Sequence, residues 1–419
     1  MKAMQNRERE SAGQYQGAAK REGWNWKPLG EVCKTGSGGT PLSSRKEYYE
    51  GGNIPWLLSG EVAQGNVRGA KNFITKAGME NSAAKLFPRD TVLVAMYGAT
   101  AGQVGILRFE AATNQAVCGI LPNEKLVPEF LFYFLLAKKD ELVAQATGNA
   151  QPNISQIKIK STEIPVPPLA EQQRIVGLLD EAFEGLATAK ANAEKNLQNA
   201  RALFESHLQS VFTQRGPGWL EKPLETAASI LNGYAFKSTD FSAKQGAKCI
   251  KITNVGIREF VSNSDGYLPE SFAEEYEKVS VKEGSIVVAL TRTIIAGGLK
   301  VAVVPEEYDG ALLNQRVASI VANEKELNSS FLFAYLSTQT VADYVKVRVN
   351  TLMQPNLSIT DLRMMPIPVP PHSAQSTITE QFESLREETQ SLARLYERKC
   401  AALEALKKSL LHQAFSGEL

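Results

Sequence analysis

Two short motifs occur twice in this chain, and both are repeated at the same spacing. The motif QPNIS begins at Gln151 and returns as QPNLS at Gln354, 203 positions later. The motif IPVPP begins at Ile164 and again at Ile367, also 203 positions later. A period of this length is far longer than the repeats of solenoid proteins, so it predicts two copies of a whole domain together with its connector.

Weaker matches extend the repeat in both directions. Asn114-Gln115 matches Asn314-Gln315 at an offset of 200, whereas Gln172 and Gln375 remain at an offset of 203. Small changes in offset before IPVPP are expected where loops differ in length between two copies. The domains are therefore the variable part of the repeat, and the connector is the constant part.

A long segment without proline follows each copy of IPVPP. From Ala170 to about Phe212, apolar residues recur every three or four positions, which predicts one amphipathic helix of about 43 residues, roughly 65 Å long. Gly216-Pro217-Gly218 is expected to end it. A second helix of equal length is predicted from about Ser373 to Ala414, and the predicted apolar stripes include Leu178 and Leu203 of the first helix and Leu392 and Leu406 of the second.

The sequence thus predicts five segments. They are a polar N-terminal arm (1–23), a first domain (24–168), a first long helix (169–215), a second domain (216–371) and a second long helix (372–419). Strand-like runs such as Thr91–Met96 and Ser285–Leu290 indicate mixed α/β domains. Pro128 to about Ala144 is predicted to form one helix of the first domain.

Two helices of equal length, each with one apolar face, are expected to bury these faces against each other. The other possibility is that each helix packs on its own domain. Because the first helix leads into the second domain and the second helix returns after it, paired helices are expected to be antiparallel. The expected fold class is α+β, with two repeated mixed α/β domains separated by two long antiparallel coiled-coil helices and related by a pseudo-two-fold axis.

Composition places the chain among ordinary globular proteins, with 43% apolar and 22% charged residues in 419. No apolar run reaches the roughly 20 residues of a membrane span, and no secretory signal is recognised, so a cytoplasmic location is expected. Four scattered cysteines fit a reducing compartment, and three histidines are expected to be structural. A net charge of +1 argues against tight DNA binding by this chain alone, although a local basic face stays possible.

Motifs of nucleotide enzymes are missing. The Pro-Pro pairs at Pro167 and Pro370 lack the preceding Asn or Asp of an amino-methyltransferase loop. No G-x-x-x-x-G-K-S/T sequence occurs, and the glycines from Gly36 to Gly39 do not follow a convincing strand, so neither ATP nor another nucleotide is expected to bind. Pro88-Arg89-Asp90 resembles part of a nuclease motif, but no E-x-K follows it. The sequence therefore predicts a protein that is not an enzyme.

The stretch IPVPPLAEQQRIVGLLD at Ile164–Asp180 resembles the central conserved region of specificity subunits of type I restriction–modification systems. The resemblance covers about residues 24–419. Further segments similar to the family are Trp26–Val32, Gly36–Pro41, Ile54–Leu57, Met96–Gly102, Asn232–Ser238 and Leu411–Leu419. The second copy departs from the first in two places: Ala374 stands where the first copy has Glu171, and Thr291-Arg292 stands where it has Tyr97-Gly98.

The resemblance implies a non-catalytic subunit with two target-recognition domains that read a bipartite, asymmetric sequence in double-stranded DNA. It also implies two methyltransferase (modification) subunits as partners, which bind S-adenosylmethionine, and restriction/translocase subunits, which use ATP. No cofactor is expected in this chain. The long helices are expected to set a fixed unread gap between the two parts of the target.

Base reading requires hydrogen-bond donors and planar groups on loops that reach the major groove. The candidate DNA-binding residues are Ser37, Thr40, Arg45, Lys46, Tyr97 and Thr100 in the first domain, and Tyr234, Lys237, Thr291, Arg292 and Thr293 in the second. Arg292 is the foremost candidate, because an arginine in a turn after a buried strand can reach guanine with two hydrogen bonds. A surface charge or a phosphate contact is its alternative role.

A hypothesis from another class stays open on the residues alone. A coiled-coil scaffold whose duplicated domains bind proteins would also combine repeated domains, divergent loops and no catalytic residues. DNA binding that depends on a methyltransferase partner distinguishes the two hypotheses.

Overall fold

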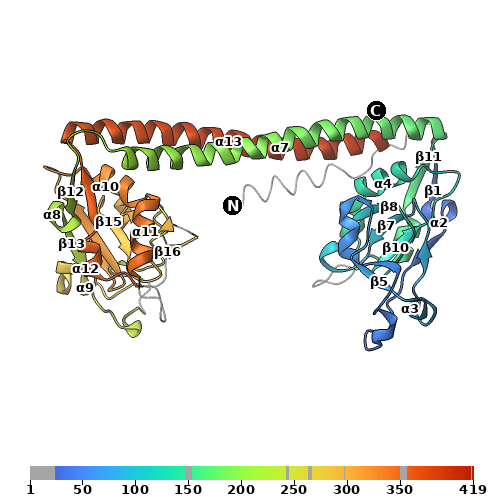
Figure 1. The fold of residues 1–419 in the computed structure, drawn as a ribbon, viewed down its shortest axis with the longest axis horizontal. Helices are drawn as coiled ribbons and strands as arrows, with labels where there is room; N and C mark the ends of the chain where they lie inside the picture. The colour runs from blue at the N-terminus through green and yellow to red at the C-terminus, as the bar shows by residue number, and fades with distance from the viewer. Residues whose placement is uncertain are drawn as a thin grey trace. The chain divides into compact units, whose positions relative to one another are not determined.

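A computed structural model describes residues 24–146, 153–241, 245–262, 267–296, 298–349, 356–416 and 418–419. The predicted arm (1–23) and the first two residues of each QPN motif lie outside these residues. The chain divides into two compact units. In Figure 1 the colour follows the residue number from blue at the N-terminus to red at the C-terminus. Unit 1 comprises Met1–Ala193 and Arg398–Leu419, and unit 2 comprises Glu194–Glu397.

Unit 1 is built on a five-stranded sheet of order β2-β10-β7-β8-β4 and a four-stranded sheet of order β5-β3-β9-β6. Its strands are β1 (Asn25–Pro28), β2 (Thr35–Ser37), β3 (Ile54–Leu57), β4 (Asn66–Val67), β5 (Asn72–Ile74), β6 (Leu86–Phe87), β7 (Val92–Ala95), β8 (Val104–Leu107), β9 (Ala111–Thr113), β10 (Val117–Ile120) and β11 (Glu163–Val166). Its shorter helices are α2 (Leu29–Val32), α3 (Lys76–Glu80), α4 (Pro128–Ala137), α5 (Lys139–Ala144) and α6 (Gln156–Ser161), with 3-10 turns η1 (Lys46–Tyr48), η2 (Ser59–Gln64) and η3 (Gly98–Thr100).

Both faces of the five-stranded sheet are covered, so its strands read as continuous apolar runs. All four residues of β7 are buried. Val92 and Val94 belong to the core cluster that includes Phe130 and Phe134 of α4, whereas Leu93 belongs to the cluster on the opposite face. Burial on both faces explains why β7 shows no alternation of apolar and polar residues.

Unit 2 is built on a four-stranded sheet of order β13-β20-β15-β18. Its strands are β12 (Leu220–Pro223), β13 (Ala228–Asn232), β14 (Cys249–Ile250), β15 (Ile286–Ala289), β16 (Ile294–Ile295), β17 (Gly298–Leu299), β18 (Val301–Val303), β19 (Leu312–Leu313), β20 (Val317–Ala322) and β21 (Pro366–Val369). Its shorter helices are α8 (Leu224–Ala227), α9 (Phe272–Glu275), α10 (Ser329–Leu336), α11 (Gln339–Arg348) and α12 (Ile359–Arg363), with 3-10 turns η4 (Ser238–Asp240), η5 (Glu277–Val279) and η6 (Glu306–Tyr308).

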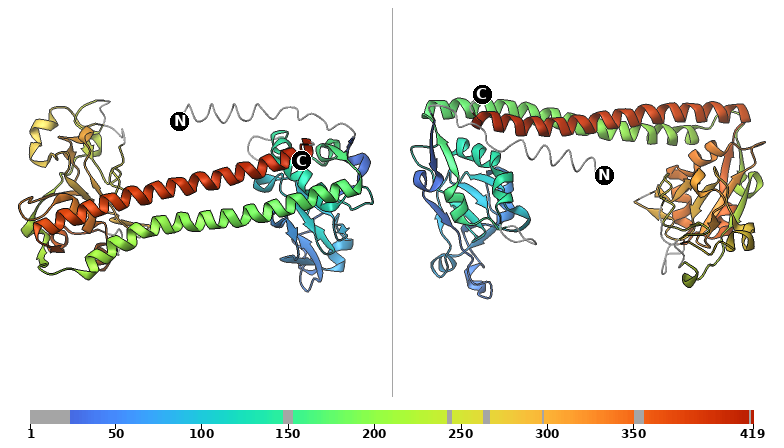
Figure 2. Two further views of the ribbon diagram at one scale, coloured as in Figure 1. Left: turned by 90° about the horizontal axis from the view of Figure 1, so that it is seen from above. Right: turned by 180° about the vertical axis from the view of Figure 1, so that it is seen from behind.

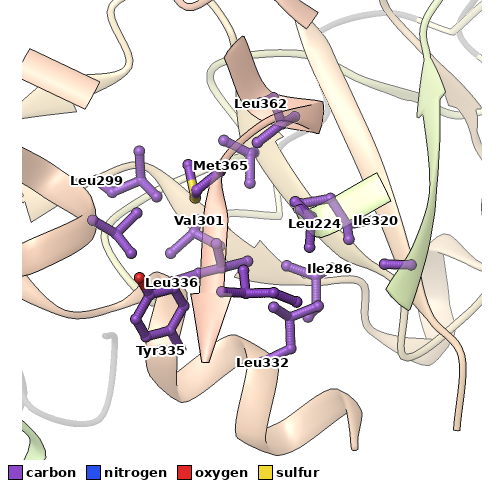
Figure 3. Packing of buried hydrophobic residues seen from close by; sticks show 14 of the residues in the cluster. Leu224, Ile286, Leu299, Val301, Ile320, Leu332, Tyr335, Leu336, Leu362 and Met365 are labelled. Carbon is purple, nitrogen blue, oxygen red and sulfur yellow. The ribbon is translucent and has the colours of Figure 1, made fainter. Parts of the chain in front are cut away.

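Apolar side chains from several elements of unit 2 meet on one face of its sheet. Figure 3 shows Ile286, Val301 and Ile320 of the sheet beside Leu332 and Leu336 of α10. The tyrosine of α10, Tyr335, is 4% exposed and donates its hydroxyl to the carbonyl of Pro366 at 2.8 Å. Because the buried phenol of Tyr335 has this hydrogen-bond acceptor, its hydroxyl group is not left unpaired.

Two long helices run through both units: α7 (Leu169–Gln214, 46 residues) and α13 (His372–Ser416, 45 residues). They are antiparallel within each unit, where Figures 1 and 2 show them side by side. In unit 1 Lys190 pairs with Glu404 and Arg174 donates to the carbonyl of Leu419 at 3.0 Å. In unit 2 Arg201 pairs with Glu397 at 2.7 Å.

The ends of the long helices are also part of each domain core. Ile175 and Phe415 belong to the core cluster of unit 1, and Phe212 and Phe382 belong to that of unit 2. The two arrangements considered from the sequence are therefore combined, because the helices pair with each other and their ends pack on the domains.

One buried glutamine holds the beginning of each long helix. The side chain of Gln172 accepts from the backbone N–H of Val127 at 2.8 Å and donates to the carbonyls of Lys125 and Pro167 at 2.9 and 2.8 Å. Gln375 accepts from Asn328 at 2.7 Å and donates to the carbonyls of Glu326 and Pro370 at 2.8 and 2.9 Å. Both glutamines are fully buried, so the repeated glutamine holds the junction between domain and long helix in each of the two units.

Two sequence-based expectations need correction. The helix expected from Pro128 to Ala144 is interrupted at Lys138, which separates α4 from α5. Some leucines assigned to the buried stripes are exposed by 41–50%, namely Leu178, Leu203, Leu392 and Leu406. The described part of the chain contains no helix that is both long and apolar enough to span a membrane.

Candidate nucleic-acid interface

Polar side chains of unit 1 gather at one edge of its five-stranded sheet. β2 ends at Ser37, which pairs with Cys118, and β7 ends at Ala95, which pairs with Val117. Because β10 begins at Val117, the turns after β2 and β7 and the turn before β10 lie at the same edge. We call these turns (residues 38–40, 96–103 and 114–116) the loop edge of unit 1.

Side-chain hydrogen bonds tie the unit 1 loop edge to neighbouring elements. The hydroxyl of Ser37 donates to Gln156 of α6 at 3.4 Å. Thr40 donates its hydroxyl to the side chain of Gln115, which stands in the turn before β10. Thr40 thus belongs to this edge, Ser37 stands directly before it at the end of β2, and Gln115 is the partner of Thr40.

The turn after β7 carries two further predicted residues. Tyr97 is 39% exposed, and its backbone forms a β-bridge with Asn153. Thr100 donates its hydroxyl to the carbonyl of Tyr97 at 3.2 Å, which closes the turn. The phenol of Tyr97 is thus presented at the surface by a turn whose backbone is fixed at both ends.

Arg45 and Lys46 belong to another surface element. Arg45 precedes η1, and Lys46 is its first residue. η1 packs on α3 through Thr75, whose N–H donates to the carbonyl of Tyr48 and whose hydroxyl donates to the carbonyl of Glu47, both at 2.9 Å. Arg45 also pairs with Glu47 at 3.2 Å. Tyr49, which follows η1, donates its hydroxyl to the carbonyl of Pro41, the residue after Thr40, so η1 is connected to the chain that leaves the loop edge of unit 1.

Unit 2 has an equivalent loop edge. β13 ends at Asn232, paired with Ala318, and β15 ends at Ala289, paired with Val317 at the start of β20. The turns that meet there are residues 233–237, 290–293 and 314–316, which we call the loop edge of unit 2. They include all five predicted residues of the second domain.

The unit 2 candidates differ in exposure. Arg292 is exposed, with a φ of 51°, whereas Thr291 is 9% exposed and Thr293 is fully buried. The hydroxyl of Thr293 has no hydrogen-bond partner among the described residues. These two threonines are placed to support the turn, and of the three residues 291–293 only Arg292 presents its side chain to solvent.

An aromatic cluster lies beside the same edge. Tyr234 is 46% exposed, and its ring centre lies 4.6 Å from that of Tyr276 and 5.1 Å from that of Phe236. Hydrogen bonding to Glu275, together with burial and a hydrogen bond to Tyr234, raises the pKa of Tyr276 to about 12. Lys237 is exposed and begins η4, with its N–H donating to Asp240 at 2.9 Å.

The repeated QPN motif holds the central turn in both units. Asn153 bridges Tyr97, and Asn356 bridges Thr291. The next residue of each motif donates its N–H to the end of the central strand, Ile154 to Met96 at 2.9 Å and Leu357 to Leu290 at 2.8 Å. The serine that follows caps the next helix: Ser155 caps α6, and Ser358 caps α12. The sequence showed the repetition of this motif, but its contact with the strand end needed the fold.

Close backbone approach at the two edges requires glycine. A Cβ on Gly38 would lie 2.1 Å from the carbonyl oxygen of Thr113, and one on Gly233 would lie 2.2 Å from that of Asn314. Both glycines donate to the first residue of the neighbouring strand at 3.3 Å, Gly38 to Val117 and Gly233 to Val317. The backbone at the two loop edges, which we call the backbone frame, is therefore alike, although the side chains differ.

Sequence reasoning missed Arg316. It precedes β20, is exposed, and pairs through its carbonyl with the N–H of Leu290 at 2.8 Å. The signal was present in the repeat, because Asn314-Gln315 is followed by arginine where Asn114-Gln115 is followed by alanine. Only the strand pairing shows that this residue stands at the same edge as Arg292.

These features define a duplicated recognition protein, in which one backbone frame carries two different sets of polar side chains. Among the described residues, no group of three or more His, Cys, Asp or Glu is arranged to hold a metal ion. A sequence model of the family described as "Type I restriction modification DNA specificity domain" matches residues 21–197 and again residues 219–397. The chain belongs to this family.

One relative resembles the chain over nearly its whole length, and another resembles a part of it. The MjaVIII specificity subunit of Methanocaldococcus jannaschii is 25% identical over 415 residues, which cover 95% of this chain and 93% of the relative. The EcoR124I/EcoR124II specificity subunit of Escherichia coli is 29% identical over 161 residues, which cover 37% of this chain and 40% of the relative.

Solved structures share the fold. A chain from a study of complex assembly and conformational transition of the type I R-M system superposes with a TM-score of 0.76, at 19% identity, over 96% of this chain and 100% of that chain. The HsdS subunit from Thermoanaerobacter tengcongensis superposes with a TM-score of 0.61, at 19% identity, over 96% of this chain and 98% of that chain. The α+β architecture with duplicated domains and long helices is thereby established.

Proposed function

We propose that this chain selects the DNA sequence for a type I restriction–modification complex and that each loop edge reads one part of a bipartite, asymmetric target. The observation that carries the proposal is the pair of loop edges, which share a backbone frame and differ in their side chains. A shared frame would place each edge on DNA in the same way, and different side chains would select different bases. Membership of the family supports this assignment over a protein-binding scaffold.

The chain is a non-catalytic subunit, as its family membership indicates. Methyl transfer to adenine would be carried out by two modification subunits with S-adenosylmethionine, and translocation and cleavage by ATP-dependent restriction subunits. We place this DNA-directed activity in the cytoplasm, and the described cysteines are all free thiols, which fits a reducing compartment.

The contact surface for the modification subunits is proposed to include the exposed leucines of the long helices. These are Leu178, Leu203, Leu392, Leu395 and Leu406, exposed by 41–52%. Apolar side chains on a helix face that the chain itself does not cover are suited to packing against a partner. The net charge of +1 fits this scheme, because DNA affinity would depend on the assembled complex.

The proposal is tested by mapping N6-methyladenine across the host genome with the gene intact and deleted. Loss of methylation at one two-part motif upon deletion is the expected result, and it would also supply the target and its gap. Unchanged methylation in a host where the modification subunit is expressed would overturn the proposal and favour the scaffold hypothesis. A complementing copy of the gene controls for effects on neighbouring genes.

A further inference from the structure

The two loop edges carry different charges at equivalent positions. Main-chain hydrogen bonds define the equivalence. Met96 donates to Ala116 as Leu290 donates to Arg316, both at 2.8 Å. Ala95 donates to Gln103 at 2.9 Å as Ala289 donates to Lys300 at 3.1 Å. Unit 2 therefore has cationic residues where unit 1 has Ala116 and Gln103.

The central turn shows the same difference. Tyr97 and Thr291 both bridge the asparagine of a QPN motif, so the residues that follow them, Gly98 and Arg292, are equivalent. Both have a positive φ, 68° for Gly98 and 51° for Arg292. An arginine with positive φ is uncommon and costs conformational energy, whereas glycine adopts that conformation readily. Unit 2 thus keeps an arginine where its backbone favours glycine.

We propose that unit 2 recognises a guanine-containing half-site with the guanidinium groups of Arg292 and Arg316, whereas unit 1 recognises its half-site without arginine at these positions. The inference rests on the proposed function and deepens it by naming the base that the second edge reads. Guanine presents two acceptors, O6 and N7, in the major groove, and the planar fork of arginine matches both.

The surroundings keep both guanidinium groups available. Arg292 and Arg316 are exposed, and neither forms an ion pair with another described residue. Lys300, in contrast, is 8% exposed and donates its ammonium group to the carbonyl of Ile252. Burial, and then the charge of Arg292, lower the pKa of Lys300. The lysine is thus engaged inside the unit, and two arginines remain for DNA.

The turn that carries Arg292 is fixed on both sides. Thr291 bridges Asn356 on one side, and Lys300 donates its N–H to the carbonyl of Thr293 at 2.8 Å on the other. A turn held in this way limits the positions open to the guanidinium group. A guanidinium group with few available positions is suited to directional hydrogen bonds with a base edge. A phosphate contact does not require such restriction, because a mobile positive charge also neutralises a phosphate.

Unit 1 offers uncharged groups instead. Exposed Gln115 and Tyr97 stand at its loop edge, with Thr40 bonded to Gln115. Amide and hydroxyl groups can hydrogen-bond to bases other than guanine. Glutamine, for example, pairs with adenine through N6 and N7. The difference predicts that exchanging arginines alters one half of the target and leaves the other half unchanged.

The experiment uses the full chain co-expressed with its modification subunits, with the methylated motif read from the genome. The variants are Arg292→Ala, Arg292→Lys, Arg316→Ala and Arg316→Lys. Alanine at 316 is already the residue of unit 1 at the equivalent position. Lys282→Ala is the control, because this exposed lysine precedes β15 at the opposite edge of the same sheet.

We expect each alanine variant to relax one guanine position of one half-site, with preference for guanine falling roughly 5- to 100-fold. Lysine should not restore it, since lysine keeps the charge and loses the fork. A uniform loss over all sequences that lysine restores, with a salt dependence weaker by about one charge, would show phosphate contacts and overturn the inference. If the methylated motif were the same with and without this chain, that result would instead refute the proposed function.

Discussion

At the scale of single residues, Gln172 and Gln375 show why a repeated polar residue can matter more than a repeated apolar one. Each satisfies one backbone N–H and two carbonyls at a domain–helix joint and is fully buried. Removing such a side chain leaves three buried polar groups without partners, which costs more than the hydrogen bonds themselves contributed. The repeat at an offset of 203 identified these glutamines, but their partners in the domain loops could not be inferred from spacing.

Replacing Gln172 with leucine should lower the free energy of unfolding by about 3 kcal/mol, because the groups that it satisfies stay buried. Gln173→Leu is the matched control, since Gln173 is the exposed neighbour on the same helix. Urea unfolding of the full chain, followed by far-UV circular dichroism, measures both variants. Equal stability of the two variants would contradict the assigned role of Gln172.

Two buried thiols predict a loss of stability in alkali. Burial raises the pKa of Cys118 and of Cys249 to about 12 from the ordinary value of 9.0. The thiolate therefore favours the unfolded chain, so the stabilisation is fully present below pH 9 and is lost as pH rises from 9 toward about 12. Urea midpoints at several pH values should fall over this range, and less steeply in a Cys118→Ala, Cys249→Ala double variant. A fall of equal steepness in both proteins would exclude the thiols as a cause.

At the scale of helices and strands, apolar periodicity predicted the existence and bounds of the long helices but not which face of each is covered. The helices begin at Leu169 and His372, directly after the Pro-Pro pairs. This start is expected, because a proline disfavours helix in the residue before it. Four leucines of the predicted stripes are nevertheless exposed. A repeat of three to four residues admits several neighbouring faces, and only the position of the partner helix selects one.

The strands after which the turns occur were also predictable, whereas the composition of the loop edges was not. β7 and β15 lie within the expected runs Thr91–Met96 and Ser285–Leu290. Thr293 looked like a polar reading residue in the sequence and is fully buried, and Arg316 was overlooked. Both outcomes depend on strand pairing between segments far apart in the chain, which local sequence does not contain.

Apolar packing, rather than ion pairs, should hold the long helices in unit 2. The ring of Phe382, 5% exposed, lies 5.8–6.4 Å from the rings of Phe204, His207 and Phe212. Phe382→Ala should cost about 3 kcal/mol, whereas Glu397→Ala should cost less than about 0.5 kcal/mol, because its pair with Arg201 is open to water. Chemical unfolding of the full chain compares the two variants. Similar losses would mean that the ion pair contributes more than its exposure predicts.

At the scale of the whole molecule, each long helix belongs to both units. The boundary between the units follows Ala193 in α7 and Glu397 in α13. Duplication alone predicted this arrangement, since a constant offset through the connector requires two equal helices. If the chain reads a bipartite target as proposed, the length of the helices, rather than the domains, would determine the unread gap of that target.

Inserting seven residues into both helices at the boundary between the units should lengthen that gap by about three base pairs. Seven residues add about 10.5 Å of helix and preserve the heptad, and base pairs are spaced about 3.4 Å apart. Methylome mapping should show the same two half-sites with a longer gap. An unchanged gap would contradict the prediction, and insertion into one helix alone serves as the misaligned control.

The first and last strands of each domain pair with each other, β1 with β11 and β12 with β21, over four residues in each case. A segment whose two ends are neighbours is joined to the rest of the molecule at one place only. The motif IPVPP, at residues 164–168 and 367–371, ends each domain directly before the long helix that follows it. Recombination between related genes on both sides of the segment that encodes one domain would therefore exchange one whole set of reading loops, so a lineage could acquire a new target while its long helices stay unchanged.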